Sequence, residues 1–309
     1  MRCAAGNGST VLVVPDGERR NALRRFGVGR GLSQRSSRYA LVALLVLGVA
    51  LGVDALCIEP ARLLVNRQEL HLPHWPAQLS GLRVAFVSDL HVGSPHWGVE
   101  RLRTLVERVN EEKPDLILLG GDYLIDDVPL GRHARAEVIA AELARLRAPL
   151  GVFGVLGNHD WWNEGEHVRE KFEAVGLTLL DDQARRIDAR GASFCLLGLR
   201  DEYFRQRNAT AEMKLALPGL PLIVLTHEPD IFSELDARVS LTLAGHTHGG
   251  QVKLPLLGRL VVPSRFGSRY AAGHIVENGR HLFVTTGVGT SILPVRFGVP
   301  PEIAVLTLR

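Results

Sequence analysis

Two histidines, His246 and His248, lie in a glycine-rich turn that directly follows an apolar run at residues 241–244. Imidazole is a common ligand for divalent metal ions, and two imidazoles at this spacing can face one metal centre. The apolar run is typical of a short buried strand that ends where polar residues begin. This stretch therefore predicts a metal site at the end of a strand.

A buried apolar strand followed by metal-binding residue types occurs at four further places in the chain. These clusters are Asp89-Leu90-His91, Gly121-Asp122, Gly157-Asn158-His159-Asp160 and Thr226-His227. Together, carboxylate, imidazole and amide oxygen suit first-row divalent ions such as Mn²⁺, Fe²⁺, Co²⁺ or Zn²⁺. Six or seven such ligands exceed the needs of one ion. They favour two metal ions about 3.5–4 Å apart, bridged by a carboxylate and a hydroxide, an arrangement suited to in-line attack on phosphorus.

The segments between the clusters predict the elements that position them. Buried strands are expected at residues 82–87, 116–119 and 151–156, each running into a cluster, with helices around 102–109 and 134–146. Beyond residue 175, short strands are expected at residues 177–180, 186–187, 193–199, 222–225, 241–244, 260–262, 282–286 and 303–308, with helices near 211–215 and 230–235. Two packed sheets flanked by helices satisfy both halves. The pattern therefore predicts an α/β protein with its ligands at the carboxyl ends of strands.

The first 79 residues differ in composition from the rest. Residues 1–38 hold eight arginines against two acids and show no regular period, which predicts a flexible basic tail. Residues 39–58 are almost continuously apolar and long enough to cross a bilayer, which favours a transmembrane anchor. Prolines in residues 59–79 indicate an extended connector, and the main domain is expected at residues 80–309.

The charge distribution predicts a topology and excludes one class of partner. Arginines before the apolar segment place the N-terminus inside and the large domain outside a single-pass cell membrane protein, by the positive-inside rule. A cleaved signal peptide and the buried helix of a soluble protein are the alternatives. Acidic residues slightly outnumber basic ones after residue 38, so no nucleic-acid duplex is expected as a partner. The three cysteines show no spacing typical of a disulfide framework or structural zinc site.

The five clusters, taken together and in this order, resemble the defining blocks of the calcineurin-like metallophosphoesterase superfamily. The resemblance covers roughly residues 80–309. Segments at 249–251, 268–273, 285–291 and 294–303 are similar to a branch of bacterial membrane-anchored or exported phosphodiesterases. The resemblance implies the metallophosphoesterase fold, a four-layer α/β/β/α sandwich of two mixed sheets, preceded here by one N-terminal transmembrane helix.

The resemblance also implies a role for each residue of the clusters. One metal ion would be held by three residues: Asp89, His91 and His248. The other would be held by three more, with Asp122 bridging both ions: Asn158, His227 and His246. The metals would be two divalent ions among Mn, Fe, Zn and Co.

His159 would face the substrate phosphate instead of binding a metal, and Asp160 would orient its ring. The alternatives are a core histidine for His159 and a helix N-cap for Asp160. Three tryptophans near the clusters either cap the core or contact substrate or lipid: Trp97, Trp161 and Trp162. Arg269 and Arg296 either bind a phosphate group or are solvated or paired with an acid.

These features predict a metal-dependent phosphoric ester hydrolase of the phosphodiesterase class, which would act through a metal-bridging hydroxide. Pyrophosphate bonds are a second candidate for the bond that it cleaves. An anchor beside such a site favours an envelope or lipid-linked phosphodiester. One alternative is a UDP-2,3-diacylglucosamine pyrophosphatase of lipid A synthesis, an activity of some relatives. A non-catalytic, membrane-tethered metal-binding module is the alternative from another class.

Overall fold

The computed structural model describes residues 27–201 and 209–309, so most of the expected basic tail, residues 1–26, lies outside the described residues. The chain divides into two compact units, Met1–Gly52 and Val53–Arg309. Helix α1 (Gly27–Val53) continues into a π-helical turn, η1 (Asp54–Ile58). The stretch Ser36–Ile58 is long and apolar enough to cross a membrane, by length and composition.

The larger unit contains a first sheet of six strands. Their order across the sheet is β1 (Leu64–Leu70), β14 (Glu302–Leu308), β2 (Leu82–Val87), β3 (Leu116–Leu119), β4 (Val152–Gly154) and β5 (Thr178–Leu179). Strands β2 to β5 are parallel, whereas β14 runs antiparallel to β2 and parallel to β1. The predicted connector, residues 59–79, therefore contributes a full edge strand, because its segment β1 pairs with the C-terminal strand β14.

A second sheet of six strands faces the first. Its order is β12 (Gly273–Glu277), β13 (Arg280–Val284), β9 (Val239–Ala244), β8 (Leu222–Leu225), β7 (Ala192–Gly198) and β6 (Gln183–Ala189). The four inner strands are parallel and the two edge strands antiparallel. Parallel strands covered on both faces read as continuous apolar runs, which explains the fully buried segment of β8.

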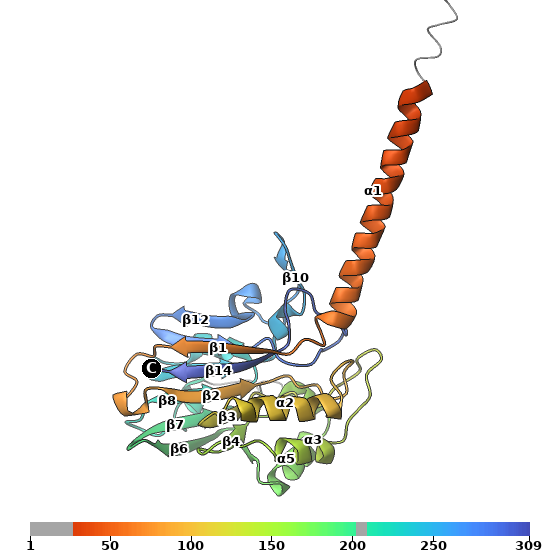
Figure 1. Ribbon diagram of the computed structural model, residues 1–309. Helices are drawn as coiled ribbons and strands as arrows, with labels where there is room; N and C mark the ends of the chain where they lie inside the picture. Colours follow the sequence, from red (N-terminus) through yellow and green to blue (C-terminus); the bar gives the residue numbers. More distant parts are fainter. Residues whose placement is uncertain (1–26, 202–208) are drawn as a thin grey trace, which may run out of the picture. The chain divides into compact units, whose positions relative to one another are not determined.

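The core is divided by the sheets into layers. Alternate residues of β2 face opposite sides: Ala85 and Val87 pack toward the helices, and Val84 and Phe86 pack toward the second sheet. The helices on the first sheet are α2 (Val99–Glu111), α3 (Ala136–Leu143) and α5 (Gly165–Ala174), which lie together in Figure 1. The outer face of the second sheet is covered by α6 (Ala209–Glu212) and the 3₁₀ helix η4 (Pro229–Glu234). The predicted α/β/β/α sandwich of two mixed sheets is confirmed.

One predicted strand is wrong. Residues 260–262 form no strand; the nearest elements are the two-residue strands β10 (Lys253–Leu254) and β11 (Gly258–Arg259) of a short hairpin. Leu260 and Val261 are 61% and 75% exposed. An apolar run alone indicates a buried strand only if something covers it, and nothing in the described part of the chain covers these two side chains.

Candidate metal centre

The five polar clusters lie at the carboxyl ends of β2, β3, β4, β8 and β9, where the two sheets meet. The backbone binds these ends to one another: the Asp89 N–H donates to the Gly121 carbonyl and the Gly245 N–H to the His227 carbonyl, both at 2.9 Å. Between the sheets, the His246 N–H donates to Asp89 Oδ1 at 2.9 Å. The topology therefore brings all five clusters to one place.

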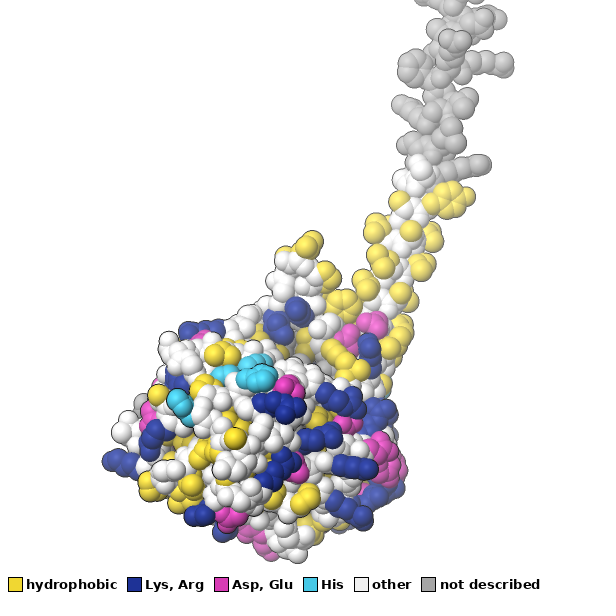
Figure 2. Space-filling model, turned by 60° about the vertical axis from the view of Figure 1, so that its left-hand side comes forward, with side chains coloured by type: hydrophobic (Ala, Val, Ile, Leu, Met, Phe, Trp, Pro, Cys, Tyr) yellow, Lys and Arg dark blue, Asp and Glu magenta, His cyan; other side chains and the backbone are white. Residues whose placement is uncertain are grey.

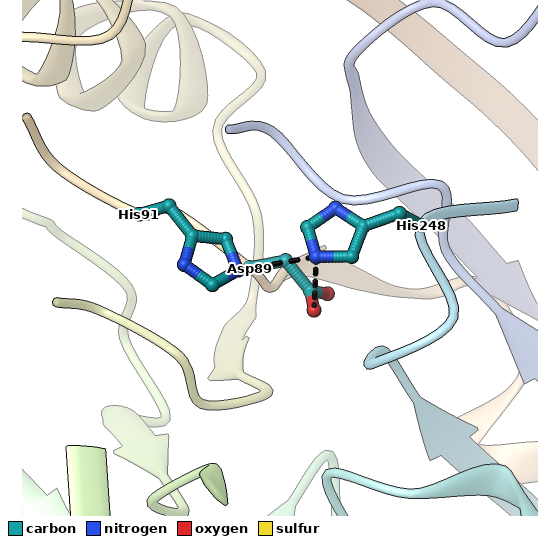
Figure 3. Close-up of side chains that lie close together, drawn as sticks. All are labelled: Asp89, His91 and His248. Carbon is teal, nitrogen blue, oxygen red and sulfur yellow. Dashed lines mark hydrogen bonds and ion pairs between the residues drawn. The ribbon is translucent and has the colours of Figure 1, made fainter. Parts of the chain in front are cut away.

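A first group consists of Asp89, His91 and His248, whose donor atoms all lie within 4.8 Å of one another. Figure 3 shows a ring nitrogen of His248 directed at both the ring of His91 and the carboxylate of Asp89. The Nε2 atoms of the two rings are 3.1 Å apart, and His248 Nε2 lies 3.5 Å from Asp89 Oδ1. All three side chains are buried, so three metal-binding atoms converge where water has little access.

A second group consists of Asp122, His227 and His246, with the side chain of Asn158 beside it. His246 Nδ1 lies 3.0 Å from Asn158 Oδ1 and 3.2 Å from His227 Nε2. The two histidines of the glycine-rich turn, His246 and His248, thus fall into different groups. Left-handed backbone at both residues separates their side chains, since φ is 67° at His246 and 49° at His248.

The Asp122 carboxylate touches both groups. Its Oδ2 atom lies 3.1 Å from His227 Nε2 and 3.6 Å from His91 Nε2. Its Oδ1 atom accepts a hydrogen bond of 2.9 Å from the His159 backbone N–H. One oxygen therefore points into the space between the imidazoles while the other is held by the chain.

Backbone carbonyls fix the orientation of two of the imidazoles. His91 Nδ1 is 3.1 Å from the Leu124 carbonyl, and His227 Nδ1 is 2.7 Å from the Gly120 carbonyl. A carbonyl can only accept, so each Nδ1 carries a proton and Nε2 is the ring nitrogen directed at the cluster. With Nε2 unprotonated, this is the tautomer that a metal ligand requires.

The site stores backbone strain. Five residues of the two groups have positive φ values, between 39° and 67°: Asp89, His91, Asp122, His246 and His248. Left-handed backbone is costly for residues other than glycine and concentrates at functional sites. The strain lets each strand turn sharply at its end and aim its side chain inward.

Two glycines are required by close packing around the carboxylates. A Cβ atom on Gly157 would lie 2.3 Å from Asp122 Oδ1, and one on Gly245 would lie 2.3 Å from Asp89 Oδ2. Any side chain at either position would displace a carboxylate from the cluster. The site itself therefore requires the glycine that precedes each of these two clusters.

Burial keeps most of the imidazoles neutral. It lowers the pKa of His91 and of His246 to about 3, and it lowers the pKa of His248 as well. His227 differs: burial opposes its charge, but the adjacent Asp122 carboxylate raises its pKa well above the usual range. A metal ion bound there would displace that proton and restore a neutral ligand.

The donor set fits divalent metal ions. Four buried imidazoles and two buried carboxylates converge with an amide oxygen, and no cysteine lies in these groups. Asp89 Oδ2 is buried without a hydrogen-bond partner. An unpaired buried carboxylate oxygen is costly unless a cation completes it, which supports metal binding at this position.

Asp160 organises the turn that carries Asp122. Its carboxylate accepts backbone N–H bonds of 2.8–3.1 Å from four residues: Asp122, Tyr123, Leu124 and Gly157. Burial and the nearby Asp122 carboxylate raise the pKa of Asp160 to about 8, and the backbone donors oppose that shift. Its hydrogen bonds therefore go to the backbone, and His159 Nδ1 has no hydrogen-bond partner.

A cavity of about 410 Å³ opens beside the two groups. Its polar end includes Asp122, His159, His246 and His248, and its other walls are mainly apolar, with Val252, Leu260, Val261, Ile292, Leu293 and Val295. His159 Nε2 lies 3.3 Å from Ser291 Oγ, and its ring centroid lies 4.5 Å from that of Trp162. His159 thus lines the cavity beside the metal-binding atoms, in contact with Ser291 and Trp162.

The tryptophans and arginines near the clusters differ in environment. Trp97 and Trp161 are buried, whereas Trp162 is 45% exposed and contacts His159. Arg269 forms two hydrogen bonds to Glu277, at 2.7 Å each. Arg296 is fully buried, donates to three backbone carbonyls and lies 3.4 Å from His248 Nδ1.

Histidines outside the clusters lie apart from the two groups. Six are exposed, namely His71, His74, His96, His133, His167 and His274, and His281 is buried against His274. Sequence reasoning gave no individual role to Ser291 or to Gln251, whose side chain bonds to both the main-chain carbonyl and the main-chain N–H of Ser291. Their only signal was their place in family-like segments, because no metal-binding residue type marks them.

Replacing Asp160 with asparagine is expected to loosen the site. An amide nitrogen cannot accept, so at least one backbone N–H loses its partner, destabilising the fold by about 1–3 kcal/mol. The turn that holds Asp122 would shift, and metal affinity should fall about 10–100-fold. Denaturant melts and metal titration calorimetry measure both effects, with the exposed Asp127→Asn as the matched control. Equal behaviour of the two variants would contradict this role.

Comparison with known proteins agrees with this geometry. The calcineurin-like phosphoesterase family model matches residues 82–250. The metallophosphoesterase YkuE of Bacillus subtilis (strain 168) is 32% identical over 255 residues, 82% of this chain and 87% of the relative. The phosphodiesterase YaeI of Escherichia coli (strain K12) is 35% identical over 230 residues, 73% of this chain and 82% of the relative. A Danio rerio transmembrane protein with a metallophosphoesterase domain is 29% identical over 90% of this chain and 63% of the relative. The chain belongs to the calcineurin-like phosphoesterase family, in the neighbourhood of YkuE and YaeI.

Proposed function

We propose that this metal-dependent phosphoester hydrolase is a two-metal phosphodiesterase. The observation that carries the proposal is the position of Asp122, whose Oδ2 atom lies within 3.6 Å of an imidazole from each group. A carboxylate in that position is suited to bridge two ions. The relative YaeI is named a phosphodiesterase, which supports the reaction class.

The two groups suggest the ligands of each ion. One ion would be held by Asp89, His91 and His248, and the other by Asn158, His227 and His246, with Asp122 placed to serve both. When bound, the two ions would stabilise charge on the phosphoryl oxygens as Lewis acids and would lower the pKa of water enough to provide a hydroxide nucleophile. Mn²⁺, Fe²⁺, Co²⁺ and Zn²⁺ all suit this mixed donor set.

His159 is the residue we assign to the substrate phosphate. It lines the cavity, its Nδ1 is unpaired, and Ser291 Oγ lies close to its Nε2. From there it can donate a hydrogen bond to a phosphoryl oxygen or a proton to the leaving oxygen. Its donor atom also lies within 4.8 Å of those of His91 and Asp122, so metal content must be measured to separate the two roles.

Variants of these residues should separate metal binding from catalysis. Asp122→Asn and His246→Ala are expected to lose bound metal and nearly all turnover of an aryl phosphodiester, because each removes a ligand. His159→Asn should keep both metal ions while turnover falls about 10²–10⁴-fold. The exposed His133→Ala is the control and should match the parent. Full activity in Asp122→Asn or His246→Ala would refute the mechanism, and metal loss in His159→Asn would make that residue a ligand.

The apolar segment and the cavity support one substrate class. Ser36–Ile58 has the length and composition of a membrane anchor, and the cavity walls are mainly apolar away from the metal-binding atoms. An envelope or lipid-linked phosphodiester or pyrophosphate has both the reactive group and the apolar portion that such a site accommodates. A UDP-2,3-diacylglucosamine also combines a pyrophosphate with apolar chains, but it is a cytoplasmic nucleotide sugar.

The side of the membrane therefore distinguishes the two substrates. Basic residues before Ser36 and the apolar segment after it favour an inner or plasma membrane location with the catalytic domain outside.

C-terminal reporter fusions after Arg309 test this topology. Alkaline phosphatase is expected to be active and green fluorescent protein dark, because only the former folds outside. Bright green fluorescence with inactive phosphatase would place the domain in the cytoplasm and would make the nucleotide sugar the favoured substrate.

A further inference from the structure

An exposed apolar surface surrounds the mouth of the cavity. The tip of the β10–β11 hairpin carries Leu256 and Leu257, which are 106% and 72% exposed. Figure 2 shows hydrophobic side chains gathered at the tip of the projection that Figure 1 labels β10. With the facing loop, the surface comprises six side chains that we call the apolar rim: Leu256, Leu257, Leu260, Val261, Ile292 and Leu293. Exposed apolar side chains gathered beside a cavity mouth favour an interaction site.

The rim is an ordered surface and not a frayed loop. Gln251 joins its two halves: its Nε2 donates to the Ser291 carbonyl at 3.0 Å, and its Oε1 accepts from the Ser291 N–H at 2.8 Å. Next to it, Val252 forms a parallel bridge with Phe297, and the Lys253 N–H donates to the Phe297 carbonyl at 2.7 Å. The hairpin and the facing loop are therefore held together as one face.

The facing loop is also bonded to the chain where the candidate membrane segment ends. The Arg296 N–H donates to the Ala55 carbonyl at 3.0 Å, and the Val299 N–H donates to the Glu59 carboxylate. The candidate span ends at Ile58. A bilayer that contains this segment must have its boundary close to these residues, and the rim begins only a few residues from Arg296. A membrane surface at this boundary would therefore lie next to the rim.

Charge around the hairpin suits a membrane surface. Residues 246–276 contain no aspartate or glutamate but include Lys253, Arg259, Arg265 and Arg269. The two on the hairpin, Lys253 and Arg259, form no ion pair within the described residues, whereas Arg269 is paired with Glu277. Basic residues beside an apolar surface are attracted to anionic headgroups.

We propose that the apolar rim inserts into the headgroup region of the membrane that holds the anchor, with Lys253 and Arg259 at the level of the phosphates. Leu260, Val261, Ile292 and Leu293 belong to both the rim and the cavity wall. The cavity therefore opens toward the bilayer. An amphiphilic phosphodiester can bring its phosphate to Asp122 and His159 while its apolar portion stays in contact with the rim. This last step rests on the proposed phosphodiesterase function, whereas insertion of the rim does not.

Insertion is tested directly on the full-length protein in vesicles of phosphatidylcholine and phosphatidylglycerol. A fluorescent label is attached to Leu257→Cys or, as control, to Val276→Cys on β12, with Cys3 and Cys57 replaced by serine. Cys195 is fully buried and does not react. Quenchers carried on lipid chains should quench the label at position 257 several-fold more than at 276. Equal weak quenching at both positions, as for a rim covered by a protein partner, would overturn the proposal.

Substrate access is tested with Leu256→Ser/Leu257→Ser against the matched pair Val175→Ser/Val276→Ser, which also removes two exposed apolar side chains. The ratio of turnover on a phosphodiester lipid in vesicles to turnover on a soluble aryl phosphodiester should fall about tenfold only in the rim variant. An unchanged ratio would refute bilayer access through the rim. If the parent hydrolyses neither substrate, the phosphodiesterase proposal fails, while the quenching result still decides insertion.

Discussion

The carboxylate of Asp122, buried between imidazoles from two sheets, is the constraint around which the site is arranged. It raises the pKa of His227, lies within reach of His91, and is fixed through its other oxygen by the His159 N–H. A buried charge of this kind is tolerated only with strong compensation. The compensating groups are brought to Asp122 by the left-handed turns, the flanking glycines and the hydrogen bonds of Asp160. Five residues with left-handed backbone therefore lie together where the metal-binding atoms meet.

How far the sequence predicts this arrangement differs between parts of the chain. The strands at 82–87, 116–119 and 222–225 were located to the residue, because parallel strands covered on both faces are continuous apolar runs ending at polar residues. The site residues were identifiable for a related reason: histidines and aspartates are seldom buried directly after such runs unless they bind a metal ion or a charged partner. Their grouping was not readable from spacing, and His246 and His248 separate because of backbone angles that no composition reveals.

Other features could be recognised only from the three-dimensional contacts. The apolar run at 260–262 was interpreted as a buried strand, since periodicity does not distinguish a covered apolar run from an exposed one. Arg296 was expected to bind a phosphate group or to be solvated or paired with an acid, but it is fully buried behind His248. Ser291 and Gln251 are polar residues without metal-binding character, and only their positions across the cavity reveal a role. These residues connect the hairpin, the facing loop and the backbone at Ala55 to the site.

The account depends most on two metal ions sharing Asp122. Anomalous diffraction from crystals of the Mn²⁺-loaded protein measures this directly. We expect two peaks about 3.5–4 Å apart on either side of the Asp122 carboxylate. One peak should contact Asp89, His91 and His248, and the other Asn158, His227 and His246. A single peak, or a pair that Asp122 does not bridge, would contradict the account.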